Sequence, residues 1–146
     1  KYNGNQAIGT EIGNWIANDV KNLKLAKNID YIIPVPLHAK KLKSRGYNQV
    51  TSFGMALSKE LNIPFNPHLL FRKKHSITQS KKDFEHRSNT ENSIFSVQFS
   101  ENEHHKHFLI IDDVFTTGTT LEQCALEILK IPGAKISLLC LSMSNQ

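Results

Sequence analysis

Residues 109–120 read Leu-Ile-Ile-Asp-Asp-Val-Phe-Thr-Thr-Gly-Thr-Thr, a short apolar run followed by two acids and a turn rich in hydroxyl groups. The apolar run begins at Phe108 and ends at Ile111 without polar alternation. It therefore predicts a strand covered on both faces, as in a parallel sheet. Asp112 and Asp113 come next, so we expect the strand to deliver two carboxylates at its carboxyl end.

The turn after the acids has the composition of a phosphate-binding loop. It carries four threonine hydroxyls and Gly118, and glycine enters backbone conformations that are closed to other residues. Leu121, Cys124, Ala125 and Ile128 follow at helical spacing, so the turn leads into a helix. A helix amino terminus offers unpaired N–H groups and about half a positive charge, which suits a phosphate dianion. The alternative is a plain cap, because Asp and Thr also begin helices in proteins that bind nothing there.

Other phosphate-binding motifs fit the chain less well. It contains neither G-x-x-x-x-G-K-[ST] nor G-x-G-x-x-G, which excludes a P-loop and a dinucleotide fingerprint. Val114 stands where a D-x-D motif would have its second acid.

The rest of the chain alternates between helix and strand patterns. Apolar residues at helical spacing run from Ile8 to Leu23, with Trp15 expected in the core. A second helix pattern carries Gly54, which would permit close packing on a sheet. Strand patterns cover residues 31–35, 67–71, 94–99 and 135–141. This order predicts an α/β fold with a mostly parallel sheet flanked by helices. The loops after Val35 and Ile111 would then meet beyond the carboxyl ends of their strands.

The positive charge is concentrated in two loops. Between Pro36 and Gly46 the net charge is +4, and between Arg72 and Arg87 it is +4 again, whereas the whole chain has a net charge of +5. Basic loops of this kind suit pyrophosphate or a nucleic-acid backbone. The alternative is a pair of solvated lysine-rich loops.

Length and composition bound the remaining possibilities. The 146 residues, 39% of them hydrophobic, predict one domain that covers residues 1–146. No apolar run reaches the roughly 18 residues that span a bilayer, and no leader pattern opens the chain, so we expect a cytoplasmic protein without membrane insertion. Cys124 and Cys140 are expected as buried free thiols. His104, His105 and His107, with Glu101 and Glu103, favour a solvated turn over a metal cluster.

Two segments carry a family resemblance. Residues 109–120 resemble the loop that binds phosphoribosyl pyrophosphate (PRPP) in type I phosphoribosyltransferases. Residues 33–38, Ile-Pro-Val-Pro-Leu-His, and residues 45–49, Arg-Gly-Tyr-Asn-Gln, resemble the competence protein F (ComF/GntX) branch. The opening residues 1–5 are similar to the start of that family's phosphoribosyltransferase domain. The cysteine cluster of family members, which resembles a small zinc module, has no counterpart in this chain.

The resemblance implies a type I phosphoribosyltransferase-like fold with a flexible loop and a small hood. The 5-phosphate would be held by Thr116, Thr117, Gly118, Thr119 and Thr120. Asp112 and Asp113 would be the catalytic carboxylates on the ribose, with Mg²⁺ as cofactor held by them or by the substrate alone. Pyrophosphate would be held by Pro36, Leu37, His38, Ala39, Lys40 and Lys41. The flexible loop that closes over the site would include Arg72, Lys73, Lys74, Lys81 and Lys82.

The implied activity is transfer of phosphoribosyl from PRPP to an acceptor that the sequence does not name. A nucleoside 5-monophosphate would bind the same loop. Thr116 stands where enzymes that salvage 6-oxopurines place an aspartate, so we expect no turnover of hypoxanthine or guanine. The alternative is a non-catalytic accessory of DNA uptake that binds PRPP or single-stranded DNA beside the competence machinery.

Overall fold

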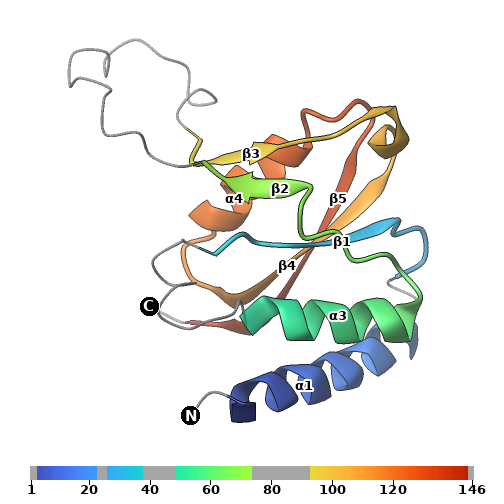
Figure 1. The fold of residues 1–146 in the computed structure, drawn as a ribbon, viewed down its shortest axis with the longest axis vertical. Coiled ribbons are helices and arrows are strands. Elements are labelled where there is room, and N and C mark those ends of the chain that lie inside the picture. Colours follow the sequence, from blue (N-terminus) through green and yellow to red (C-terminus); the bar gives the residue numbers. More distant parts are fainter. Residues whose placement is uncertain (1–2, 23–25, 38–48, 74–92, 145–146) are drawn as a thin grey trace, which may run out of the picture.

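The computed structural model describes residues 3–22, 26–37, 49–73 and 93–144 (Figure 1). The elements along the chain are α1 (Asn3–Asn22), β1 (Tyr31–Pro34), α3 (Gln49–Leu61), β2 (Leu70–Arg72), β3 (Phe95–Val97), the short 3-10 helix η1 (Glu101–Glu103), β4 (His107–Phe115), α4 (Thr119–Ile128) and β5 (Lys135–Met143).

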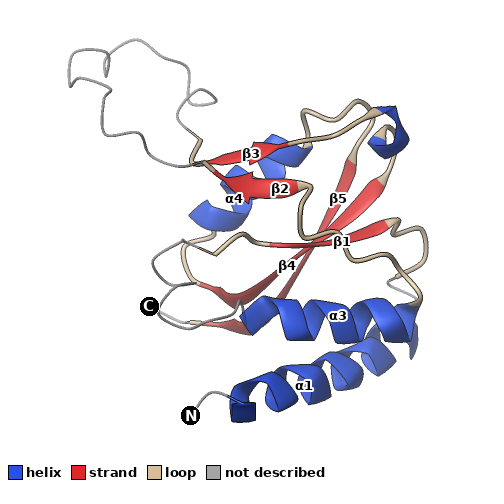
Figure 2. Cartoon of the chain, in the orientation of Figure 1, coloured by secondary structure: helices blue, strands red, loops and turns tan. Residues whose placement is uncertain are grey.

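A three-stranded parallel sheet forms the centre of the molecule, in the order β1-β4-β5. Helices α1 and α3 lie on one side of this sheet and α4 lies on the other (Figure 2). The strand register places Tyr31 beside Phe108 and His107 beside Lys135. The predicted α/β architecture with a parallel sheet is thus confirmed.

The central strand β4 is buried on both faces, as its unbroken apolar run predicts. Phe108 and Ile110 pack in a cluster with residues of α4, whereas Leu109 and Ile111 pack in a second cluster with residues of α3. This follows from the period of two in a strand, which sends successive side chains to opposite faces. The sheet therefore separates two hydrophobic cores.

Helix α3 approaches the sheet closely at Gly54, as the sequence predicts. A Cβ atom at this position would lie 2.5 Å from the ring of Phe65 and 2.6 Å from Cδ1 of Ile111. Any larger side chain would push α3 away from the strand that leads to Asp112 and Asp113.

A small antiparallel pair of strands, β2 and β3, packs against α4 and flanks the segment predicted to form the flexible loop. Leu70 pairs with Val97, and Arg72 pairs with Phe95. Arg72 was expected in the flexible loop, but it is the last residue of β2. The bond from the backbone N–H of Lys73 to the carbonyl of Ile94, 2.9 Å long, continues this ladder by one residue. Arg72 and Lys73 are therefore held by the hydrogen bonds between β2 and β3, and they do not belong to the predicted flexible loop.

Two further expectations are corrected. Trp15 is 79% exposed, so it is not a core residue; the buried residues of α1 are Gly13, Ala17 and Val20. Strand β4 also continues four residues beyond Ile111, because β5 keeps pairing with it as far as Phe115 and Met143. Asp112 and Asp113 are therefore strand residues. None of the described helices combines the length and apolarity that crossing a membrane requires.

Candidate functional site

The candidate site lies where β1 ends and β4 continues. The last residue pair of these two strands is Pro34 and Ile111. The backbone N–H of Val35 then donates to the carbonyl of Ile111 over 2.9 Å. Beyond this bond β4 pairs only with β5, so Asp112 to Phe115 form an overhang at the carboxyl edge of the sheet. Pro36 and Leu37, both partly buried, follow β1 on the same edge.

The two acids of the overhang face opposite sides of the sheet. Their neighbours Ile110 and Ile111 belong to the cores on the α4 side and the α3 side, respectively. By the same alternation, Asp112 points to the α4 side and Asp113 to the α3 side. Both side chains are half-buried, and Oδ1 of Asp112 accepts a 2.9 Å hydrogen bond from the backbone N–H of Asp113. The structure therefore gives the two acids different surroundings.

The residue directly before α4 is Gly118, and its backbone conformation is one that favours glycine. Gly118 is the N-cap of α4, with φ 80° and ψ −12°, in the left-handed region. A Cβ atom there would also lie 3.0 Å from Cζ of Phe115. Gly118 provides no side-chain cap, and its carbonyl accepts the first helical bond from the N–H of Glu122 over 2.9 Å. The amino terminus of α4 is therefore bordered by threonine hydroxyls rather than by a capping side chain.

The threonines of this loop are exposed, and two of their hydroxyls lie close to each other. Oγ1 of Thr117 and Oγ1 of Thr119 are 3.0 Å apart. A hollow of about 20 Å³ is lined by Asp112, Val114, Phe115, Thr116, Gly118, Thr120 and Leu121. Its volume is that of one water molecule, so a sugar phosphate would bind across the loop rather than inside the hollow. Asp112 is thus brought together with the threonine loop, whereas Asp113 is not among the lining residues.

Two thiols lie behind the acids. Burial raises the pKa of Cys124 to about 12, and the carboxylate of Asp112 adds to this effect. Burial also raises the pKa of the half-buried Cys140, with further contributions from Asp112 and Asp113. Both cysteines are free, as predicted, but only Cys124 is fully buried. Neither thiol is prepared for nucleophilic chemistry.

Arg72, at the end of β2, places its guanidinium against an aromatic ring of β3. Its Cζ lies 5.4 Å from the centre of the Phe95 ring, in a cation–π contact. Its positive charge also lowers the pKa of Cys124, against the larger effects of burial and Asp112.

Several predicted site residues lie outside the described part of the chain. These are His38, Ala39, Lys40 and Lys41 of the expected pyrophosphate loop, and Lys74, Lys81 and Lys82 of the expected flexible loop. Their roles remain predictions.

The histidine-rich turn before β4 has local partners. Nε2 of His107 lies 2.9 Å from Oγ of Ser137 on β5, and the rings of His104 and His105 meet edge to face at 6.5 Å. Within residues 3–22, 26–37, 49–73 and 93–144, no three His, Cys, Asp or Glu side chains are grouped as metal ligands.

A larger cavity, of about 380 Å³, was not anticipated from the sequence. It is lined by Asn66, His68, Leu69, Gln98, Phe99, Ser100 and Glu103. No sequence motif predicts this cavity, because its residues come from two segments about 30 positions apart. These segments meet only when β2 pairs with β3.

Comparison with solved structures identifies the fold. The chain superposes on the purine phosphoribosyltransferase from Pyrococcus horikoshii with a TM-score of 0.56 at 20% sequence identity, covering 92% of this chain and 73% of that one. The protein therefore has the type I phosphoribosyltransferase fold.

Comparison with characterised sequences identifies the family. No family model matches the chain. Competence protein F of Haemophilus influenzae is 39% identical over 109 residues, which are 72% of this chain and 46% of that protein. The DNA utilization protein YhgH of Shigella flexneri is 29% identical over 112 residues, which are 77% of this chain and 48% of that protein. The chain belongs to the competence protein F family and matches about half the length of these relatives.

Proposed function

We propose that the carboxyl edge of β4 binds the phosphoribosyl part of PRPP, or a nucleoside 5-monophosphate, and that the protein is a phosphoribosyl-transferring member of its fold class. One observation carries this proposal. The side chain of Asp112, the loop at Thr116 and the glycine-capped amino terminus of α4 line the same hollow. A carboxylate for sugar hydroxyls thus stands beside N–H and hydroxyl donors for a phosphate.

Each part of the site would have a separate role. The backbone N–H groups at the start of α4 and the threonine hydroxyls would hold the 5-phosphate, helped by the helix dipole. Asp112 would accept hydrogen bonds from ribose hydroxyls on the α4 side, and Asp113 would act from the opposite side of the strand. Asp112 is thereby expected to contribute more to binding.

The residues present fit Mg²⁺ as a cofactor. The carboxylate of Asp112, which lines the hollow, offers the hard oxygens that this ion prefers, and the ion keeps several waters and binds substrate phosphates. Asp113 lies on the opposite side of the strand, so it would not share one ion with Asp112. When bound, Mg²⁺ would neutralise charge on the pyrophosphate oxygens.

The reaction would be substitution at the anomeric carbon of the ribose. The acceptor forms the new bond to this carbon, and pyrophosphate departs with the electron pair of the broken C–O bond. Negative charge develops on the departing oxygen, so cations beside it would favour the reaction. Lys40 and Lys41 are the residues that the sequence proposes for this role.

Calorimetry with PRPP and Mg²⁺ tests the proposal. We expect wild-type protein to bind PRPP, Asp112→Asn to lose about tenfold or more in affinity, and Asp113→Asn to lose less. Glu122→Gln is the matched control, since it removes the same charge from the exposed first turn of α4. This control should bind PRPP at least as well as wild type. No binding by wild-type protein at millimolar PRPP, or equal binding by both Asp variants and wild type, would contradict the proposal.

Release of pyrophosphate from PRPP in the presence of different bases tests the enzymatic part. With Thr116 at the position of the salvage aspartate, hypoxanthine and guanine should give negligible turnover. Robust turnover of either base would instead show that the protein acts as a purine-salvage enzyme.

A second candidate function is an accessory role in DNA uptake in the cytoplasm, with single-stranded DNA and the competence machinery as partners. The observation that favours it is the name of the related DNA utilization protein, together with the basic loops of this chain. Binding of single-stranded oligonucleotides over a range of salt concentrations discriminates between the two functions. Binding that vanishes near physiological salt while PRPP binding persists would favour the enzyme.

A further inference from the structure

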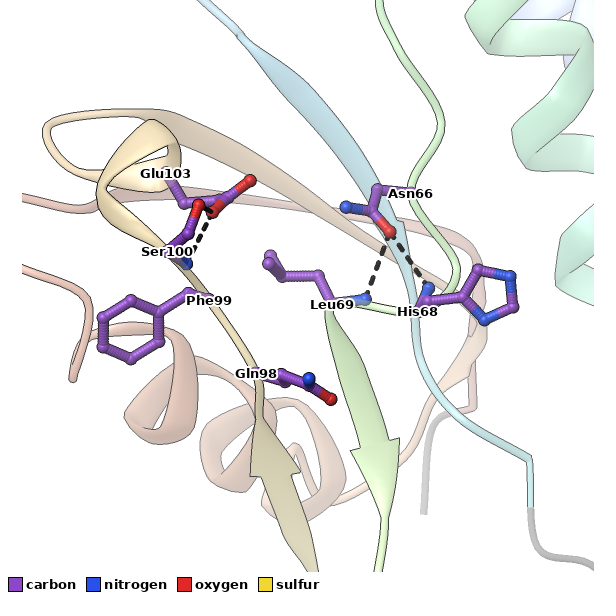
Figure 3. A pocket seen from close by; sticks show the side chains of 7 residues that line it. All are labelled: Asn66, His68, Leu69, Gln98, Phe99, Ser100 and Glu103. Atoms are coloured by element: carbon purple, nitrogen blue, oxygen red, sulfur yellow. Dashed lines mark hydrogen bonds between the residues drawn. The ribbon is translucent and has the colours of Figure 1, made fainter.

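The cavity of about 380 Å³ lies at the end of the hairpin where β2 begins and β3 ends (Figure 3). The segments on either side are joined by the 2.9 Å bond from the N–H of Gln98 to the carbonyl of Leu69. The cavity shares no lining residue with the hollow at the start of α4. A ligand bound here would therefore contact different residues from those proposed to bind PRPP.

The side chain of Asn66 is fixed with its amide nitrogen toward the cavity. Its Oδ1 accepts hydrogen bonds from the backbone N–H groups of His68 and Leu69, at 3.1 and 3.2 Å. Because only the oxygen can accept from both donors, the orientation of the amide is determined. Figure 3 shows that Nδ2 then points toward Glu103 on the other side of the cavity.

Glu103 presents the complementary group. Its Oε2 accepts from both the backbone N–H and the hydroxyl of Ser100, each at 2.8 Å, in the capping box of η1. These bonds lower the pKa of Glu103, so the carboxylate stays ionised at neutral pH. The other oxygen, Oε1, points into the cavity toward Asn66 (Figure 3).

The surface between these two groups is apolar. Leu69, which is 3% exposed, lies between Asn66 and Glu103, whereas the ring of Phe99, 39% exposed, points away from these two residues (Figure 3) and lies 6.0 Å from the ring of His104. A fixed donor and a fixed anionic acceptor thus face each other across an apolar floor. A ligand whose donor and acceptor are close together and project between the two groups can bond to both.

We propose that this cavity binds a nucleobase that carries an exocyclic amino group. The amino group of cytosine or adenine would donate to Glu103, and the adjacent unprotonated ring nitrogen would accept from Asn66. Carboxylates accept from the cytosine amino group in other protein–nucleic acid contacts. Thymine lacks the amino group, so it is disfavoured. The base can belong to a free nucleotide or to a single strand, and the proposal does not depend on PRPP binding.

Two isosteric variants test the proposal. Glu103→Gln can keep an oxygen on the Ser100 donors while turning the cavity-facing acceptor into a donor. Asn66→Asp keeps an acceptor for the two backbone N–H groups while turning the cavity-facing donor into an acceptor. The matched controls are Glu101→Gln and Asn102→Asp in the exposed part of η1, which make the same charge changes outside the cavity. Fluorescence anisotropy with 12-nucleotide oligo-dC and oligo-dT, with dCMP as competitor, gives the readout.

We expect wild-type protein to prefer oligo-dC over oligo-dT about tenfold, and each cavity variant to lose that preference. Removing a negative charge by itself strengthens DNA binding, so a weaker Glu103→Gln beside an unweakened Glu101→Gln isolates the hydrogen bond. Competition by dCMP as strong as by oligo-dC would assign the site to free nucleotides. Photocrosslinking of 5-iodocytosine oligonucleotides to the peptide that holds Phe99 is a second readout that needs no variant. Equal affinities for both oligonucleotides together with crosslinks outside residues 66–69 and 98–103 would overturn the proposal.

Discussion

Asp112 of β4 and Cys124 of α4 lie on the same side of the sheet, and their proximity acts on the thiol. Burial raises the pKa of Cys124 to about 12, and the neighbouring carboxylate disfavours the thiolate further. The site that we propose for a sugar phosphate thus has a protonated thiol beneath it. The thiol serves as a small apolar group that packs α4 on the strand.

Cys124 should accordingly resist alkylation in the folded protein. At pH 8 a thiol with a pKa near 12 is ionised to about one part in ten thousand, and Cys124 is also inaccessible. Titration with Ellman's reagent should show the half-buried Cys140 reacting first and Cys124 reacting only after addition of denaturant. Prompt reaction of both thiols without denaturant would show that α4 leaves the sheet readily.

Gly118→Ala should destabilise the protein. The left-handed backbone costs a residue with a Cβ atom about 1–2 kcal/mol, and the new methyl group would press on the ring of Phe115. Urea unfolding measures the loss. Gly9→Ala, at a half-buried position inside α1, is the matched control and should not destabilise, because alanine favours the helical backbone by about 1 kcal/mol over glycine. Equal effects of both changes would contradict the assigned conformation of the loop.

The two large aromatic residues of the α1–α3 layer should differ sharply on truncation. Phe53 is fully buried, so Phe53→Ala should cost about 3–5 kcal/mol of unfolding free energy. Trp15 is 79% exposed, so Trp15→Ala should change stability by less than about 0.5 kcal/mol. Thermal unfolding of both variants at one pH makes the comparison. A large loss for Trp15→Ala in the isolated domain would reinstate it as a core residue.

Asp30 should make stability depend on pH at the acidic end. Its carboxylate accepts from the backbone N–H of His107 at 2.8 Å and from Lys106 at 3.3 Å, and the first of these bonds is the main cause of its lowered pKa. Because the pKa is lower in the folded state, the stabilisation is present above the unfolded pKa. It is lost as the pH falls through the folded pKa.

Asp30→Asn should therefore be less stable than wild type at neutral pH, and the difference should shrink below about pH 4. The side chain of Asp30 is 37% exposed, so we expect a loss below about 1 kcal/mol. Urea unfolding between pH 2 and pH 7 gives the curve, and Asp19→Asn on the exposed side of α1 provides the control. A difference that grows toward low pH would contradict this account.

Sequence reasoning predicted the parts of the fold in which one local pattern decides the structure. The apolar run at Phe108 predicted a strand covered on both faces, and the spacing from Leu121 to Ile128 predicted a helix that buries one face; both are confirmed. The conformational freedom of Gly118 and the close packing at Gly54 also followed from local chemistry, and both are confirmed.

The errors came where long-range contacts override the local pattern. Asp112 was expected past the end of its strand, but pairing with Cys140 on β5 keeps it in the sheet. Trp15 was assigned to the core because its spacing matched, although the small residues Gly13 and Ala17 are what α1 packs against α3. The cavity between Asn66 and Glu103 left no signal, because each residue also serves as an ordinary turn or cap.

The pairing of β1 with β4 has a consequence for how the protein is made. The bond between Asp30 and His107 joins residues 77 positions apart, and the carboxyl edge exists only after this pairing forms. Closing so long a loop delays folding, since its entropy is lost before the contacts compensate for it. During synthesis, the segment that contains Val35 must wait for more than 70 further residues before its partner strand leaves the ribosome. Until then β1 has only its bridge from Ile32 to Phe65 and the cover of α3, and its edge toward β4 stays unpaired.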